Sequence, residues 1–161
     1  MAEDGAKVRF PAVDPATVEA RTGSSYPDQF KAGVEEREKR ALGDAVGLTN
    51  FGANLVRLKP GAASAHRHWH SRQDEFVYIL EGEVTMITED GEQTLGPGMA
   101  AGFGKGRADG HHLINRGAED VVYLEVGDRS PGDAVSYPDI DLALTTGDGK
   151  GRFTNKKGEP Y

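Results

Sequence analysis

The histidines of this chain fall into two clusters, a grouping that indicates metal binding rather than scattered core or surface positions. His68 and His70 lie in the first cluster, HRHWHSRQDE, and residues two apart on a strand face the same side. Glu75 follows, just before the apolar run FVYIL. A carboxylate buried there is unfavourable unless a cation pairs with it. Two imidazoles and one carboxylate are therefore expected to point at one ion.

The second cluster, GHHLIN, is expected to supply one more imidazole. Neighbours on a strand point to opposite sides, so only one of its two histidines can face an interior. Alternation favours His111 as the fourth ligand, with His112 as the alternative. Such a set suits Mn, Fe, Ni, Cu or Zn and does not suit Ca or Mg. We therefore predict one divalent transition metal ion (Mn, Fe, Ni or Zn), bound by His68, His70, Glu75 and His111.

Residues near the two clusters receive other roles. His66 shares the strand parity of the first cluster and is expected to be exposed at the start of the strand, with a supporting or ligand role as the alternative. Trp69 is expected to point the opposite way and to pack. Asn115 is expected to orient the site by hydrogen bonding rather than to bind metal. Tyr123, in VVYLEVG, is expected in the core.

Short strands separated by turn residues are predicted from about residue 48 to residue 127. About eight strands at this spacing, without an alternating helix, indicate an all-β fold: an antiparallel sandwich, jelly roll or barrel. Asp90-Gly91 is expected to form a two-residue hairpin. The predicted strands are Asn54–Leu58, Ala65–His70, Glu75–Leu80, Glu83–Thr88, Gln93–Leu95, Ala100–Phe103, His111–Asn115 and Val121–Val126.

The flanking segments are polar and are expected to be extensions of the central domain. Residues 1–47 are predicted to hold at most short helices and to pack on the barrel, with Asp14-Pro15 as a helix start. The charged run EEREKR, 35–40, is expected to be a solvated helix face or loop, and 30–42 could add a helical turn or two. Residues 128–161 are expected to pack on the barrel or on a second subunit.

Composition excludes several classes of protein. The net charge of −7 argues against a nucleic-acid partner, which needs a clustered basic face. The chain has no cysteine, so disulfides and zinc–thiolate sites are excluded. No segment approaches the ~20 consecutive apolar residues that a membrane helix needs. The polar N-terminal residues carry no signal-peptide pattern, and we expect a cytoplasmic protein with no membrane partner.

The two histidine segments resemble the metal motifs of the cupin superfamily. Its first motif is G, five residues, HxH, three or four residues, E, six residues, G; here Gly82 ends it with matching spacings, although Gly61 precedes His68 by six residues. The second is G, five residues, PxG, two residues, H, three residues, N. It matches at Gly98, Gly106, His111 and Asn115, but Gly104 replaces proline and four residues precede His111.

This resemblance, over about residues 48–127, implies an antiparallel double-sheet jelly-roll barrel and a homodimer. By analogy, the reaction would be dioxygen insertion, decarboxylation, isomerisation or lyase chemistry on a small polar molecule, with Glu81 or Glu83 as a candidate acid or base. The alternatives are a non-catalytic barrel that binds or senses a small ligand, and a purely structural metal.

Overall fold

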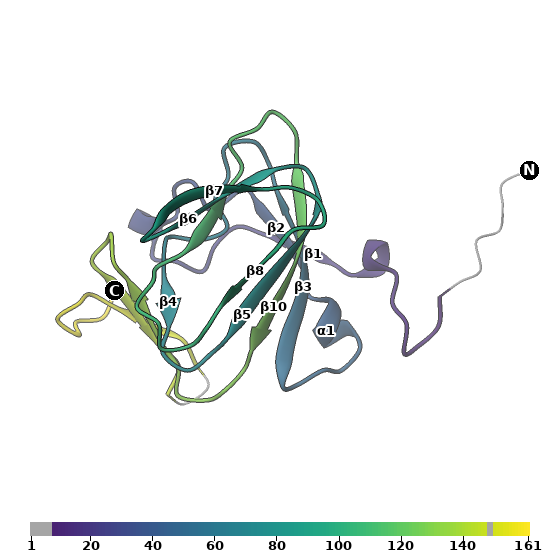
Figure 1. The fold of residues 1–161 in the computed structure, drawn as a ribbon. Helices are drawn as coiled ribbons and strands as arrows, with labels where there is room; N and C mark the ends of the chain where they lie inside the picture. Colours follow the sequence, from purple (N-terminus) through teal and green to yellow (C-terminus); the bar gives the residue numbers. More distant parts are fainter. Residues whose placement is uncertain (1–7, 148–149) are drawn as a thin grey trace, which may run out of the picture.

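The computed structural model describes residues 8–147 and 150–161, and these residues form an almost entirely β protein. Figure 1 shows two layers, with β3, β10, β5 and β8 in one and β6 and β7 in the other. The antiparallel jelly-roll barrel predicted from the sequence is confirmed. The first seven residues of the predicted N-terminal extension lie outside the described part.

The largest sheet has six strands in the order β1-β2-β3-β10-β5-β8, and all its pairs are antiparallel. Two smaller sheets have the orders β13-β12-β11-β4 and β7-β6-β9. The strands are β1 Ala20–Thr22, β2 Arg37–Arg40, β3 Phe51–Leu58, β4 Trp69–His70, β5 Glu75–Glu81, β6 Val84–Thr88, β7 Gly91–Leu95, β8 Ala100–Phe103, β9 His112–Ile114, β10 Val121–Asp128, β11 Ala134–Tyr137, β12 Leu142–Thr145 and β13 Arg152–Thr154.

The main core lies between the layers. It contains the inward residues of the central strands, including Val56, Ile79 and Tyr123, each with an exposed fraction of 0%. Alternation along β5 places Val77 and Ile79 inside. It leaves the outward residues exposed, namely Phe76, Tyr78 and Leu80. The homodimer remains a prediction, and the molar mass from light scattering in solution would check it.

The N-terminal segment differs from the prediction. Its only helical pieces among the described residues are short, η1 (Pro15–Thr17), η2 (Asp28–Phe30) and α1 (Leu42–Ala45), and Asp14 caps η1 as expected. The predicted helix face or loop at 35–40 is wrong over its last four residues, because β2 covers them and pairs with β3. The segment thus adds two strands to the large sheet. Backbone pairing outweighed the alternating charges of this run.

The C-terminal segment packs on the barrel, one of the two expected alternatives. β11 pairs with β4, the strand that ends at His70. Val135, Tyr137 and Leu142 form a second apolar core there. The domain boundaries at 47 and 127 remain predictions, although both flanking segments contribute strands to sheets.

Two local predictions need correction. The predicted strand Ala65–His70 is regular only at Trp69–His70, and the preceding residues are bends with a single bridge at His68. The hairpin between β6 and β7 exists, but Thr88 pairs with Gly91, so the two loop residues are Glu89 and Asp90. Among the described residues, no helix is long and apolar enough to cross a membrane.

Candidate metal centre

An antiparallel bridge joins the two histidine clusters. The His68 N–H donates to the His111 carbonyl at 3.1 Å, and the His111 N–H donates back to His68 at 2.9 Å. Glu75 begins β5, where it lies opposite Phe103 of β8. Segments more than 35 residues apart in the sequence therefore meet beside the barrel cavity, as the sequence predicted.

Three of the four predicted ligands place their donor atoms within 4.8 Å of one another: His68, His70 and Glu75. Nε2 of His68 lies 3.5 Å from Oε2 of Glu75, and Nε2 of His70 lies 3.6 Å from Oε1. All three side chains are largely buried, with 13–21% of each exposed. Two imidazole nitrogens and a carboxylate at these separations fit a transition metal ion between them.

The opposite nitrogens of these two imidazoles are held by acceptors. Nδ1 of His68 lies 2.8 Å from the carbonyl oxygen of His66, and Nδ1 of His70 lies 2.6 Å from Oδ2 of Asp133. An imidazole facing an acceptor at Nδ1 carries a proton there, so in the neutral ring the lone pair is on Nε2, the atom on the side of Glu75. The rings are therefore oriented as metal ligands require.

His111 lies beside Glu75, whereas His112 does not. Nε2 of His111 is 2.7 Å from Oε2 of Glu75, and its ring stacks on Phe103 with centroids 3.6 Å apart. Its Nδ1 is buried and has no hydrogen-bond partner among the described residues. His111 is outside the group whose donors all lie within 4.8 Å. Its direct contact with the carboxylate still makes it the histidine available as a fourth ligand.

The comparisons with known proteins agree with this geometry. A family model described as the cupin domain matches residues 54–127, the part that holds all four residues. A crystal structure from Silicibacter pomeroyi, described as a sugar phosphate isomerase from a cupin superfamily, shares 40% identity. The match covers 94% of this chain and 96% of that one, with a TM-score of 0.90. This chain belongs to the cupin superfamily.

Two further structures resemble this cupin. One, from Acidithiobacillus ferrooxidans, is provisionally named a sugar phosphate isomerase; it is 33% identical over 78% of this chain and 80% of its own, with a TM-score of 0.71. The other is a polyketide cyclase from Streptomyces resistomycificus, 21% identical over 74% of this chain and 80% of its own, with a TM-score of 0.61. The second shares the fold alone. No curated protein matches this cupin in sequence.

The pKa values of the donor residues in this cupin depend on one another. Burial lowers the pKa of His70, but hydrogen bonds and charges from Glu75 and Asp133 outweigh it and raise the pKa to about 9. Burial raises the pKa of Glu75, yet the surrounding imidazoles hold it well below its usual range. In the metal-free cupin, a protonated His70 thus faces an ionised Glu75. A bound cation would replace that proton.

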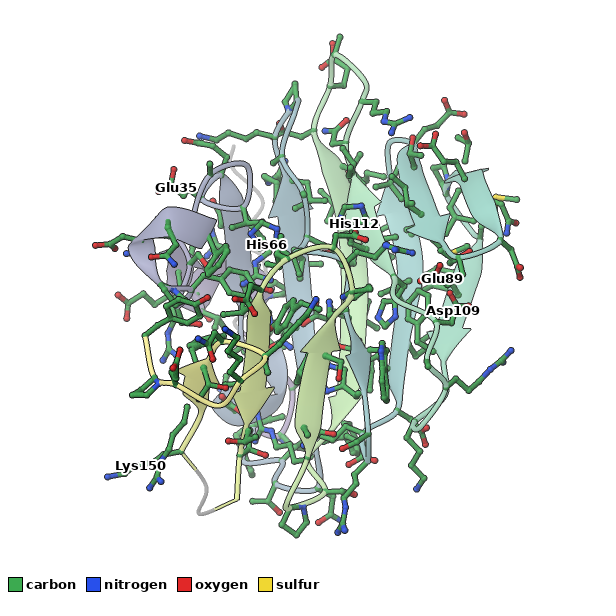
Figure 2. The ribbon with its side chains drawn as sticks, turned by 90° about the vertical axis from the view of Figure 1, so that its left-hand side faces the viewer. Glu35, His66, Glu89, Asp109, His112 and Lys150 are labelled. Atoms are coloured by element: carbon green, nitrogen blue, oxygen red, sulfur yellow. The ribbon has the colours of Figure 1, made fainter. Side chains whose placement is uncertain are left out.

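The remaining two histidines, labelled in Figure 2, have other partners. Nε2 of His66 contacts the Phe30 carbonyl at 2.6 Å, and its ring packs against Tyr26, so it is half-buried rather than exposed. Its carbonyl supports His68, which gives it a supporting role through the backbone. Nδ1 of His112 contacts the Ala65 carbonyl at 3.0 Å, and burial lowers its pKa.

Two other expectations about the site are wrong. Asn115 does not contact the donors; its amide bonds the backbone at Leu58, Glu119 and Gly117. Glu81 and Glu83, the suggested acid or base, do not line the cavity; Glu81 ends β5 and Glu83 lies in the turn before β6. The cavity, of about 290 Å³, contains a different carboxylate, Glu125 of β10.

Asp133 is a site residue that the sequence did not reveal. It has an exposed fraction of 2% and binds Nδ1 of His70, the Ser71 hydroxyl at 3.2 Å and the Arg72 N–H at 2.8 Å. It lies 63 residues after His70, in the C-terminal segment, so no local spacing marks it. The structure thus adds a carboxylate–histidine pair behind the donors.

Asp133→Asn is expected to change the pH profile of metal binding. Because His70 must lose its proton to bind, wild-type affinity should rise about tenfold per pH unit and level off near the pKa of about 9. Without the Asp133 carboxylate the pKa falls, so the affinity levels off at lower pH. At the plateau, the metal affinity of the variant should be roughly 10–100-fold weaker than that of wild type. Competition of nickel against a chelator measures both, and an unchanged profile would contradict this role.

Proposed function

We propose that this cupin is a metal-dependent enzyme that acts on a small polar molecule in the barrel cavity. The observation that carries the proposal is the convergence of the His68, His70 and Glu75 donors on that cavity. His111, in contact with Glu75, would complete the set around one Mn, Fe, Ni or Zn ion. Four protein ligands leave open positions on an octahedral ion, as catalysis requires and a structural site does not.

Isomerisation of a sugar phosphate is the reaction to test first. The relative from Silicibacter pomeroyi carries that name and shares 40% identity over 96% of its length. Such a reaction moves one proton between two adjacent carbon atoms, one of them the carbonyl carbon, and a second proton between the oxygens that these carbons carry. It therefore needs an electrophile for the carbonyl oxygen and a group that accepts the proton.

The chain offers residues for the second requirement. A bound metal ion would supply the first, as a Lewis acid that polarises the carbonyl oxygen. Glu125 lines the same cavity. Its Oε1 forms an ion pair with Nζ of Lys39 at 2.6 Å and accepts a hydrogen bond from the Asn54 amide at 3.2 Å. These two contacts fix the carboxylate in place. We propose that Glu125 accepts the substrate proton and returns it.

Glu125→Gln is expected to lower turnover strongly while the protein keeps its metal. An amide retains the shape and one acceptor oxygen, but it cannot take up a proton. The loss should be about 100-fold or more in kcat, within the usual contribution of a general base. Separate loading with Fe(II), Mn(II), Ni(II) and Zn(II), followed by a screen of sugar phosphates, measures turnover. Elemental analysis measures the metal.

Glu36→Gln is the matched control, because Glu36 also pairs with a lysine, Lys59 at 3.0 Å, but on the surface. It should keep full turnover. If no metal gives turnover with any sugar phosphate or carbonyl metabolite, the enzyme proposal is contradicted. Compounds that stabilise the protein against heating but are never converted would favour the non-catalytic ligand-binding alternative.

A further inference from the structure

The cavity that contains the metal donors continues toward β2. Arg37 and Lys39 of this strand line the cavity together with Tyr123. In the sheet, Lys39 lies opposite Val56, which lies opposite Tyr123, so this row shares one face. Val56 and Tyr123 have exposed fractions of 0%, which identifies that face as the interior. Arg37, two residues before Lys39, points to the same side.

Two polar atoms at this end of the cavity lack partners. Nε of Arg37 and the hydroxyl oxygen of Tyr123 are both buried, and neither has a hydrogen-bond partner among the described residues. Nη1 of Arg37 donates to the Ser64 carbonyl at 2.5 Å, which anchors the guanidinium. Burial raises the pKa of Tyr123 well above its usual value, so its hydroxyl keeps the proton that it can donate. Buried donors without acceptors are unfavourable and need an acceptor from outside the chain.

Among the described residues at the β2 end of the cavity, Arg37 is the cationic side chain available to an anion. Lys39 is neutralised by Glu125, 2.6 Å away. Glu75 is surrounded by imidazoles and by any metal that they bind. Arg37 forms no ion pair with the described residues. An arginine whose Nε–H has no acceptor is suited to donate to a carboxylate or phosphate group.

We propose that Arg37 and Tyr123 form an oxyanion subsite that holds the charged group of the ligand at the end of the cavity next to β2. The inference deepens the proposed function and rests on it for the other end of the ligand, which the metal centre would receive. The ligand class is a small hydroxylated molecule with one carboxylate or phosphate group. Recognition is by N–H and O–H donation to its anionic oxygens.

Calorimetric titration of the manganese-loaded protein tests this subsite. The probes are glycolate for the carboxylate arm, glycerol 3-phosphate for the phosphate arm and glycerol as the neutral control. One anionic probe should bind at least about tenfold more tightly than glycerol, since charged hydrogen bonds are the stronger ones. The anionic probe that binds more tightly shows whether the subsite prefers a carboxylate or a phosphate group. Equal binding of all three would mean that the two donors are satisfied by water, and would overturn the subsite.

Three variants separate binding from folding. Arg37→Met and Tyr123→Phe should each weaken the preferred anion by about tenfold or more. Arg57→Met removes an arginine that pairs with Asp120 outside the cavity, and it should leave the affinity unchanged. Tyr123→Phe should not lower the melting temperature of the ligand-free protein, because its hydroxyl has no partner to lose. A lower melting temperature with unchanged affinity would show a structural role instead.

The metal content distinguishes the two ways of failing. If all variants hold metal and the anion affinity of Arg37→Met and Tyr123→Phe equals that of wild type, the subsite is wrong and the metal centre stands. If wild type holds no metal, the proposed function fails, and the same titrations on that metal-free protein decide the subsite. If anion binding to the metal-free protein still depends on Arg37, the subsite is supported. If that binding does not depend on Arg37, the subsite is overturned.

Discussion

Replacement of His68 by alanine is expected to remove the bound metal ion. His68 supplies one of the three donors that lie within 4.8 Å of one another, and its Nδ1 contact with the His66 carbonyl directs Nε2 at Glu75. The methyl group of alanine leaves one imidazole and one carboxylate in that group. The affinity should fall by more than about 100-fold, since loss of a mere supporting partner already costs 10–100-fold. Mass spectrometry on protein purified without a tag measures the metal content.

His111→Ala tests the fourth ligand in the same way. His111 touches Glu75 at 2.7 Å, so its removal should also deplete the metal. Trp69→Phe is the control: Trp69 lies between two of the donor positions in sequence but is not among the donors, and it should keep the full metal content. Full metal in both histidine variants would contradict the assignment. Depletion in His68→Ala alone would reduce the centre to His68, His70 and Glu75.

The sequence was sufficient to place those side chains of the candidate site that follow local rules. Strand alternation selects His111 over His112 because successive side chains must take opposite faces, and the bridge between His68 and His111 leaves His111 on the interior side. The spacing from His70 to Glu75 allows one polar turn and a return along β5. Alternation and spacing act within one short segment, where backbone geometry decides, whereas the bridge between the two segments decides which side is interior.

The missed features depend on contacts between distant segments. β2 is a run of charged residues, REKR, whose composition favours solvent; it forms a strand because β3 offers an open edge. The cavity is polar enough to accept Arg37 and Lys39, which composition could not show. Asp133 reaches His70 only because β11 pairs with β4. Tyr123 was correctly placed in the core, but its unpartnered hydroxyl is a property of the packed cavity.

Asn115→Ala is expected to be strongly destabilising without affecting the metal centre directly. Asn115 has an exposed fraction of 0%, and its amide nitrogen donates to the Leu58 carbonyl at 2.9 Å and the Glu119 carbonyl at 2.8 Å. Its oxygen accepts from the Gly117 N–H at 3.0 Å. The variant leaves these backbone groups without their partner, at a cost of about 3 kcal/mol or more. The melting temperature should fall by roughly 6–12 °C.

Asn155→Ala is the matched control for that loss. Asn155 also uses both ends of its amide group, donating to the Glu159 carboxylate at 2.5 Å and accepting from the Lys157 N–H at 3.0 Å, but in an exposed turn near the C-terminus. Solvent replaces those bonds, so its melting temperature should change by only about 2 °C, as for most surface changes. Folded Asn115→Ala protein should keep its metal, because Asn115 contacts the backbone between β3 and β10 rather than a donor. Metal loss from folded protein, at a temperature well below its melting point, would show that Asn115 orients the donors after all.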